Sequence, residues 1–341
     1  MVEAHVVDAW TRDADRHGTP FMYAVFLAGL AAPLFLFLAG VALAMSASAR
    51  SATAGVGVAA AAARFRGWQV FALAFLFRLQ SQLLGWGALI NFLKVDILNV
   101  MGLSMVAAGA LWGLGSTRGS RVMLFATAAA LVAMSTPLVR EAPGLALLPD
   151  PIEAYIRPMA GRSNFAIFPW AAFLLAGAIV GELVGAASAI TLQGGLFAAG
   201  LFGVAAGYWA SFQPSIYPMA NFWTSSPTFF FIRLGICTAL VPMAWVIDQR
   251  PRFSESIRSL PGAPGLLIAL GRSSLFVYWI HVEMVYGVIG RPFRRALPLS
   301  ASIAATILLC LLLYSIVLWK NRMMEGVKLT GGLRIFAPVL K

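Results

Sequence analysis

Two short groups of residues near the ends of the chain have side chains and spacing suited to proton transfer. His5 and Asp8 lie three residues apart, so a helix places them on one face. A carboxylate beside an imidazole holds its tautomer and stabilises its cation, as a general base requires. His281 lies on one helical stripe with Tyr278 and Ser274. Two alternatives remain open: structural or interfacial histidines, and a helix cap in which Asp8 pairs with Arg12.

Other polar side chains interrupt apolar runs, where an ionisable group costs several kcal/mol unless it faces a partner or a cavity. Arg78 and Gln82 share a helical face in the middle of one run. We expect Arg78 to pair with Asp96 or with a ligand phosphate. Glu182 is expected to extend toward the end of its helix. The remaining candidates of this kind are Gln80, Asn99, Arg162, Asn164, Arg233, Arg272 and Glu283.

Long apolar segments must position these side chains. Of the 341 residues, 60% are apolar and 11% are charged, whereas ordinary soluble domains have about 25% charged residues. A membrane span needs about 20 mostly apolar residues. Nine runs qualify: 21 to 48, 67 to 87, 96 to 115, 120 to 138, 165 to 186, 190 to 211, 228 to 248, 264 to 288 and 299 to 319. These runs lack the alternation of a membrane β-barrel. The predicted fold is therefore all-α, a polytopic transmembrane helix bundle.

The first ten residues, MVEAHVVDAW, resemble the last turns of a helix and are too short and too acidic for a signal peptide. We expect them to be the end of a truncated first span. We also expect residues 1–341 to form a single transmembrane domain.

Charge and composition narrow the partners and the placement in the membrane. The net charge of +12 is spread between the apolar runs, which favours anionic lipid over nucleic acid. The three histidines and two cysteines offer no metal-ligand spacing. Because Lys and Arg favour cytoplasmic loops, we expect a multi-pass protein of the inner (plasma) membrane. Residues 49 to 66 are then inside, and the loops 139 to 164 and 212 to 227 are outside.

Five segments together resemble a known enzyme family. They are MVEAHVVDAW, AAPLFLFLAGVALAM (Ala31 to Met45), KVDILNVMGLSMV (Lys94 to Val106), SNFAIFPWAAFLLAGAIVGEL (Ser163 to Leu183) and LGRSSLFVYWIHVEMVYGVI (Leu270 to Ile289). In this order they look like bacterial relatives of heparan-alpha-glucosaminide N-acetyltransferase. That family resembles a wider set of transmembrane acyltransferases, which includes the acyltransferase-3 proteins.

The resemblance implies transfer of an acetyl or other acyl group, to oxygen or nitrogen. The donor is cytoplasmic acyl-CoA, and the acceptor is a saccharide or glycan on the outer side. On this interpretation the catalytic residues are His5, Asp8 and His281. The expected substrate-binding residues are Arg78, Gln82, Asp96, Asn99, Arg162, Asn164, Arg233 and Tyr278. Cations on the inner side would bind the phosphates of CoA, and the expected CoA-binding residues are Arg64, Arg66, Arg272 and Ser274.

Two other classes of protein remain open from the residues alone. The same intramembrane charges would suit a transporter or flippase for a lipid-linked or anionic substrate. They would also suit a membrane scaffold or sensor whose buried polar groups only pair with one another. Stabilisation by acetyl-CoA is the observation that separates an acyltransferase from both classes.

Overall fold

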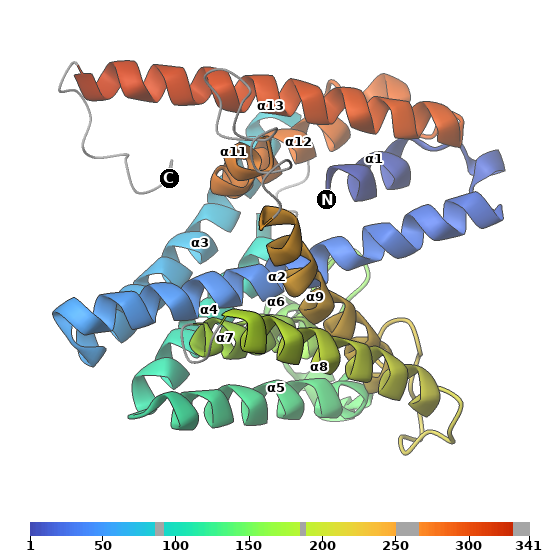
Figure 1. Cartoon of the computed structure of the whole chain (residues 1–341). Helices are drawn as coiled ribbons and strands as arrows, with labels where there is room; N and C mark the ends of the chain where they lie inside the picture. Colours follow the sequence, from blue (N-terminus) through green and yellow to red (C-terminus); the bar gives the residue numbers. More distant parts are fainter. Residues whose placement is uncertain (86–91, 185–188, 250–265, 330–341) are drawn as a thin grey trace. The chain divides into compact units, whose positions relative to one another are not determined.

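The computed structural model describes residues 1–85, 92–184, 189–249 and 266–329, and helices make up most of them (Figure 1). The longer helices are α1 (Val2–Trp10), α2 (Thr19–Ala54), α3 (Val56–Gly85), α4 (Ile97–Leu114), α5 (Arg118–Glu141), α7 (Ile167–Leu183), α8 (Ala189–Ala210), α9 (Pro227–Asp248), α12 (Ser274–Tyr286) and α13 (Leu299–Leu329). The shorter ones are η1 (Asp13–Asp15), η3 (Pro143–Leu147), α6 (Asp150–Ile156), α11 (Leu266–Arg272) and η4 (Arg291–Phe293). Pairing of extended backbone in these ranges is limited to two isolated bridges.

The prediction of an all-α membrane protein is confirmed. Among the described residues, six helices are long and apolar enough to cross a membrane, namely α2, α4, α5, α8, α9 and α13. Helix α7 is apolar but shorter. Every predicted span overlaps one helix or, in the case of the run 264 to 288, two helices. Residues 86 to 87, 185 to 186 and 264 to 265 of those spans lie outside the described residues. The count of nine spans, the truncated first span and the single domain stay predictions.

One predicted span is interrupted. The run 264 to 288 forms two helices, because α11 ends at Arg272 and α12 begins at Ser274. Ser273 between them has φ −106° and ψ 21°, which is outside the helical region. Its hydroxyl accepts a hydrogen bond of 2.8 Å from the Lys320 ammonium of α13. Arg272 is therefore the last residue of α11, directly before the break.

The chain divides into two compact units. The first consists of residues 1–31 and 246–341, and the second of residues 32–245. In the first unit, apolar residues of α1, α12 and α13 pack into one cluster around Val6, Trp10, Val285 and Leu313. This cluster determines how α1 lies against the other two helices.

The second unit relies on close helix contacts at glycine. A Cβ atom added at Gly40 of α2 would overlap the backbone of Leu174 in α7, and one at Gly177 of α7 would overlap the Phe37 carbonyl. A Cβ atom added at Gly102 of α4 would likewise overlap the backbone of Phe71 in α3. Without a hydrophobic force between helices in lipid, such close contact is a main source of packing energy.

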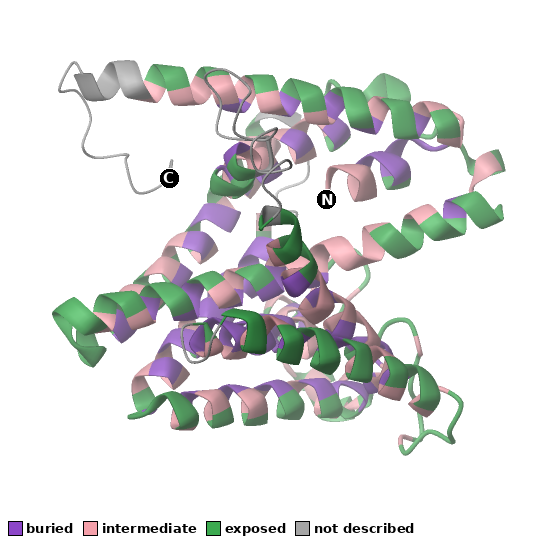
Figure 2. Cartoon of the chain, in the orientation of Figure 1, coloured by how far each residue is buried: buried purple, intermediate pink, exposed green. Residues whose placement is uncertain are grey.

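Burial differs sharply between neighbouring helices of this unit. Most residues of α7 are buried, whereas α8 is exposed along most of its length (Figure 2). The exposed side chains of α8 include Ile190, Phe202 and Trp209. An apolar surface that is exposed along most of a helix is suited to contact with lipid.

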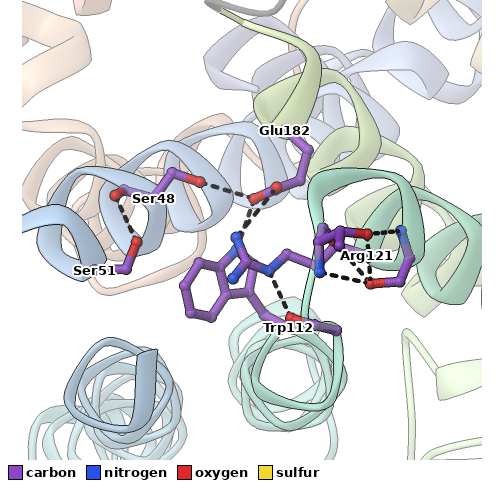
Figure 3. Close-up of polar contacts among 8 residues, drawn as sticks. Ser48, Ser51, Trp112, Arg121 and Glu182 are labelled. Atoms are coloured by element: carbon purple, nitrogen blue, oxygen red, sulfur yellow. Dashed lines mark hydrogen bonds and ion pairs between the residues drawn. The ribbon is translucent and has the colours of Figure 1, made fainter. Parts of the chain in front are cut away.

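A buried ionic network joins four helices of the second unit (Figure 3). The Glu182 carboxylate of α7 accepts hydrogen bonds of 2.6 Å from the Trp112 indole of α4 and 2.9 Å from the Ser48 hydroxyl of α2. The Arg121 guanidinium of α5 lies 3.7 Å from the second carboxylate oxygen. It also lies 3.7 Å from the centre of the Trp112 ring and donates to the Gly115 carbonyl.

The position of Glu182 corrects the expectation from the sequence. We expected its side chain to extend toward the end of its helix, but the residue is only 1% exposed. The prediction was wrong because other helices bring the indole, the hydroxyl and the guanidinium to the carboxylate. Pairing of this kind removes the cost of an isolated buried charge.

The glycine contacts predict a stability difference between two matched variants. Gly177→Ala should destabilise the protein by about 1–3 kcal/mol, because its Cβ atom needs space that the Phe37 carbonyl occupies. Gly194→Ala on α8 is the control, since a Cβ there meets no atom within 4 Å. Denaturation in detergent micelles measures both. Equal stability of the two variants would contradict the packing described.

The ionic network predicts a second difference. Glu182→Ala should cost about 3–5 kcal/mol, because it leaves a buried guanidinium and an indole N–H without their acceptor. Glu141→Ala, at an exposed position near the end of α5, should stay within about 0.5 kcal/mol of wild type. Thermal unfolding of purified protein compares the two. If Glu182→Ala melts like Glu141→Ala, the network does not hold the helices together.

Candidate active site

Backbone pairing holds α1 against the segment between α12 and α13. The Leu297 carbonyl accepts from the Arg12 N–H at 2.8 Å, and the Trp10 carbonyl accepts from the Leu297 N–H at 2.9 Å. The Arg295 N–H donates to the Ala9 carbonyl at 3.0 Å. Trp10 also donates its indole N–H to the Val285 carbonyl at 3.1 Å. These bonds fix α1 beside the end of α12.

This arrangement brings two of the three predicted catalytic residues into contact. The His5 and His281 rings lie with their centres 5.2 Å apart. His5 is half-buried, and His281 is 1% exposed. Tyr278, one turn before His281 on α12, is buried with its ring centre 5.7 Å from that imidazole. Ser274 lies at the exposed first position of the same helix.

The hydrogen bonding of His281 determines which nitrogen carries the proton. Its Nδ1 lies 2.6 Å from the Val277 carbonyl oxygen. A carbonyl only accepts, so Nδ1 is the donor and the neutral ring has its lone pair on Nε2. Nε2 is buried and has no hydrogen-bond partner among the residues that the structure describes. A buried basic atom without a partner is a candidate for chemistry.

His5 is connected to Asp8 through a residue that spacing did not identify. The Tyr286 hydroxyl lies 3.1 Å from His5 Nδ1 and donates to an Asp8 carboxylate oxygen at 3.4 Å. The other Asp8 oxygen pairs with Arg16 at 3.2 Å. We expected Asp8 to act on the imidazole directly, but the hydrogen bonds between them run through Tyr286. Nothing in the helical periodicity of α1 indicates Tyr286, because it comes from the far end of the sequence.

Charged residues of the loop after α1 hold this end of the unit together. Arg12 contacts Asp15 at 3.1 Å, and Asp15 also accepts from the Leu299 N–H at 3.0 Å. These two hydrogen bonds hold the pKa of Asp15 below its usual value. Arg295 pairs with Asp13 at 3.1 Å. The loop is therefore tied to the start of α13.

The second unit contains another group of predicted site residues. Arg78 and Asp96 form an ion pair of 3.0 Å, which is the partner that the sequence led us to expect. Asp96 caps α4 by accepting from the Leu98 N–H, while the Asn99 side chain accepts from the Asp96 N–H. Asn99 also donates to the Tyr155 hydroxyl at 3.2 Å. Gln82 lies on α3, where it is half-buried and interacts with another residue.

A short backbone bridge places two further predicted residues beside this group. Val95 donates to the Arg162 carbonyl at 2.9 Å and accepts from the Asn164 N–H at 3.0 Å. The Arg162 side chain pairs with Asp150 at 2.9 Å. Lys94 lies next to this bridge, and burial together with the charge of Arg78 lowers its pKa. Lys94 was not among the candidate site residues predicted from the sequence.

The remaining predicted residues lie elsewhere. Arg233 is half-buried on α9, with its guanidinium 3.9 Å from the centre of the Phe229 ring. Arg64 is exposed on α3, and Arg66 on the same helix donates to Gln69 at 3.3 Å. Arg272 is exposed at the end of α11. Within the described ranges no three metal-ligating side chains come together.

Comparison with known proteins identifies the family. The family model described as heparan-alpha-glucosaminide N-acetyltransferase, catalytic, matches residues 10–191, more than half of the chain. The match runs from the end of α1 to the start of α8, so it includes Arg78 and Asp96 and leaves out His5 and His281. No curated protein and no solved structure matches the chain.

The family match and the apolar helices support the same conclusion. The matching family is that of an acetyltransferase catalytic domain, and six described helices are long and apolar enough to cross a membrane. Together they indicate a multi-pass membrane acetyltransferase. The chain belongs to the heparan-alpha-glucosaminide N-acetyltransferase catalytic family.

Proposed function

We propose that the protein transfers an acetyl group from cytoplasmic acetyl-CoA to a saccharide on the outer side of the inner (plasma) membrane. The acceptor atom is a hydroxyl oxygen or an amine nitrogen. The observation that carries the proposal is the pair of adjacent imidazoles, in which His281 Nε2 is buried and without a partner among the described residues. The family match supports the acetyl transfer.

The reaction needs a base and a group that stabilises negative charge. The base removes the acceptor proton as the acceptor attacks the thioester carbonyl. Collapse of the tetrahedral intermediate breaks the carbon–sulfur bond and releases CoA, whose thiolate takes up a proton. The lone pair on His281 Nε2 suits the base, since Val277 fixes the tautomer. An N–H donor nearby would stabilise the oxyanion.

His5 and Asp8 complete the proposed catalytic group. His5 lies against His281, so one imidazole can act as base while the other, protonated, donates to the oxyanion. Transfer proceeds either directly to the acceptor or through an acetyl-histidine, in which an imidazole nitrogen first takes the acetyl group and releases CoA. A burst of CoA release without acceptor identifies the second route.

We assign the substrate-binding role to side chains of the second unit and to Tyr278. Arg78, Gln82, Asp96 and Asn99 lie at the facing ends of α3 and α4, and Arg162 and Asn164 lie on the bridged segment beside them. Carboxylates, amides and guanidinium groups together suit the many hydroxyl groups of a saccharide. Arg233, also proposed for binding, is a cation on α9 whose guanidinium lies over the Phe229 ring.

For CoA, we propose the cations Arg64, Arg66 and Arg272, with Ser274, as contacts for its phosphates. Arg64 and Arg272 are exposed, and Arg66 is half-buried. One guanidinium group can donate two parallel hydrogen bonds to the oxygens of one phosphate, which makes arginine a common residue at phosphate sites. Arg64 and Arg66 lie near the start of α3, and Arg272 and Ser274 flank the break between α11 and α12.

The histidine pair predicts a loss of transfer that does not come from unfolding. His281→Gln and His5→Ala should each lower kcat by about 100- to 10000-fold, because each removes a proposed acid or base. CoA release by purified protein, with a saccharide acceptor present, measures the rate. His17→Gln is the matched control, since His17 is exposed in the loop before α2. Near-wild-type turnover of His281→Gln, or an equal loss in His17→Gln, would contradict the assignment.

Binding of the donor predicts a stability change that needs no acceptor. Acetyl-CoA at 100 times its Kd should stabilise the protein by about 2.7 kcal/mol, because it binds only the folded state. Thermal unfolding in detergent with and without acetyl-CoA measures this, and ATP at equal concentration is the control for a general polyanion effect. Transporters of other substrates, or scaffolds, would not respond. An unchanged melting temperature would contradict donor binding.

A further inference from the structure

The contacts of Tyr286 give this residue a role beyond the proposed catalytic groups. We propose that Tyr286 is a positioning residue that holds His5 in the tautomer with its proton on Nδ1 and its lone pair on Nε2. The inference rests on the proposed function, because it concerns how the same histidine is prepared for proton transfer.

The direction of each hydrogen bond follows from the chemistry of its partners. The Tyr286 hydroxyl lies between His5 Nδ1 at 3.1 Å and Asp8 Oδ2 at 3.4 Å. An ionised carboxylate only accepts, so the single hydroxyl proton goes to Asp8. The hydroxyl oxygen then accepts the proton of His5 Nδ1–H. This leaves the lone pair of the neutral ring on His5 Nε2.

Asp8 is held in place for this contact by a cation. Arg16 donates to the Asp8 carbonyl at 2.7 Å and to its carboxylate at 3.2 Å. The guanidinium therefore fixes both the backbone and the side chain of Asp8. Its contact with one carboxylate oxygen leaves the other oxygen, Oδ2, as the acceptor for the Tyr286 hydroxyl.

The end of α12 fixes Tyr286 itself. Gly287 follows it, and its N–H donates to the Glu283 carbonyl at 2.9 Å. A Cβ atom at Gly287 would overlap that carbonyl, so the helix end has no room for another residue type. Arg294 donates to the Tyr286 carbonyl at 3.3 Å. These backbone contacts fix the position of Tyr286, and the pair of Arg16 and Asp8 fixes the acceptor of its hydroxyl.

Removal of the hydroxyl alone tests the proposal. In wild type the centres of the His5 and Tyr286 rings are 5.4 Å apart. Tyr286→Phe keeps this ring contact and loses both hydrogen bonds of the hydroxyl. Protein labelled with 15N-histidine reports the tautomer of each imidazole by NMR. The chain has three histidines, so spectra of His17→Gln and His281→Gln assign the His5 signals. Steady-state acetyl transfer gives kcat and KM for the same samples.

In wild type, His5 should be in the Nδ1–H form. In Tyr286→Phe it should shift toward the Nε2–H form, which is the commoner tautomer of free imidazoles, while kcat falls by at least about 10-fold and KM changes less than twofold. Tyr23→Phe is the matched control, an exposed tyrosine of the first unit that should behave as wild type in both measurements. Asp8→Ala should change the tautomer in the same direction, since it removes the acceptor that orients the hydroxyl.

Three results would overturn the proposal. They are an Nε2–H form of His5 in wild type, an unchanged tautomer in Tyr286→Phe, and a changed tautomer with unchanged kcat. The NMR measurement does not depend on transfer, so its outcome stands apart from that of the proposed function. If wild type transfers no acetyl group but the tautomer shifts as expected, the proposed function fails and the positioning of His5 by Tyr286 remains.

Discussion

Buried charge must be paired in an apolar interior, and this constraint explains the contacts of Glu182 and the pairing of Arg78 with Asp96. Glu182 is enclosed by an indole, a hydroxyl and a guanidinium from three other helices. Arg78 and Asp96 neutralise one another at the ends of α3 and α4. In both cases removal of one partner would leave the other without compensation. The pairs therefore specify which helices pack together, in addition to the glycine contacts between their backbones.

The histidine group of the first unit departs from this constraint. His281 has one nitrogen bonded to a carbonyl and the other buried without a partner in the described part of the chain. A group left in this state costs free energy, which is typical of functional sites. The surrounding contacts are well satisfied, since α1 is fixed by backbone pairing to residues 295 to 297 and Asp8 is held by Arg16. A rigid frame around an unpartnered basic atom is an arrangement suited to catalysis.

Sequence reasoning succeeded where a signal is local. Apolar runs predicted the helices, and an intramembrane cation required an anion, which led from Arg78 to Asp96. It failed where the partner comes from a distant segment. The surroundings of Glu182 and the contact of Tyr286 with His5 depend on helix packing that no spacing encodes. The break at Ser273 was also missed, because Arg272, Ser273 and Ser274 lie inside a long apolar run that favoured one continuous span. The contact of Ser273 with Lys320 comes from a distant helix.

The central claim is that acetyl transfer occurs at the two adjacent imidazoles of His5 and His281. The most direct measurement is an experimental structure of the full chain with a non-hydrolysable acetyl-CoA analogue bound. For the acetyl-histidine route, the account predicts the acyl carbonyl carbon at about 3–4 Å from an imidazole nitrogen of His5 or His281. For direct transfer, it predicts room for one acceptor atom between that carbon and the nitrogen. An acyl group seated more than about 10 Å from both rings, beyond any direct or single-water proton transfer, would contradict it.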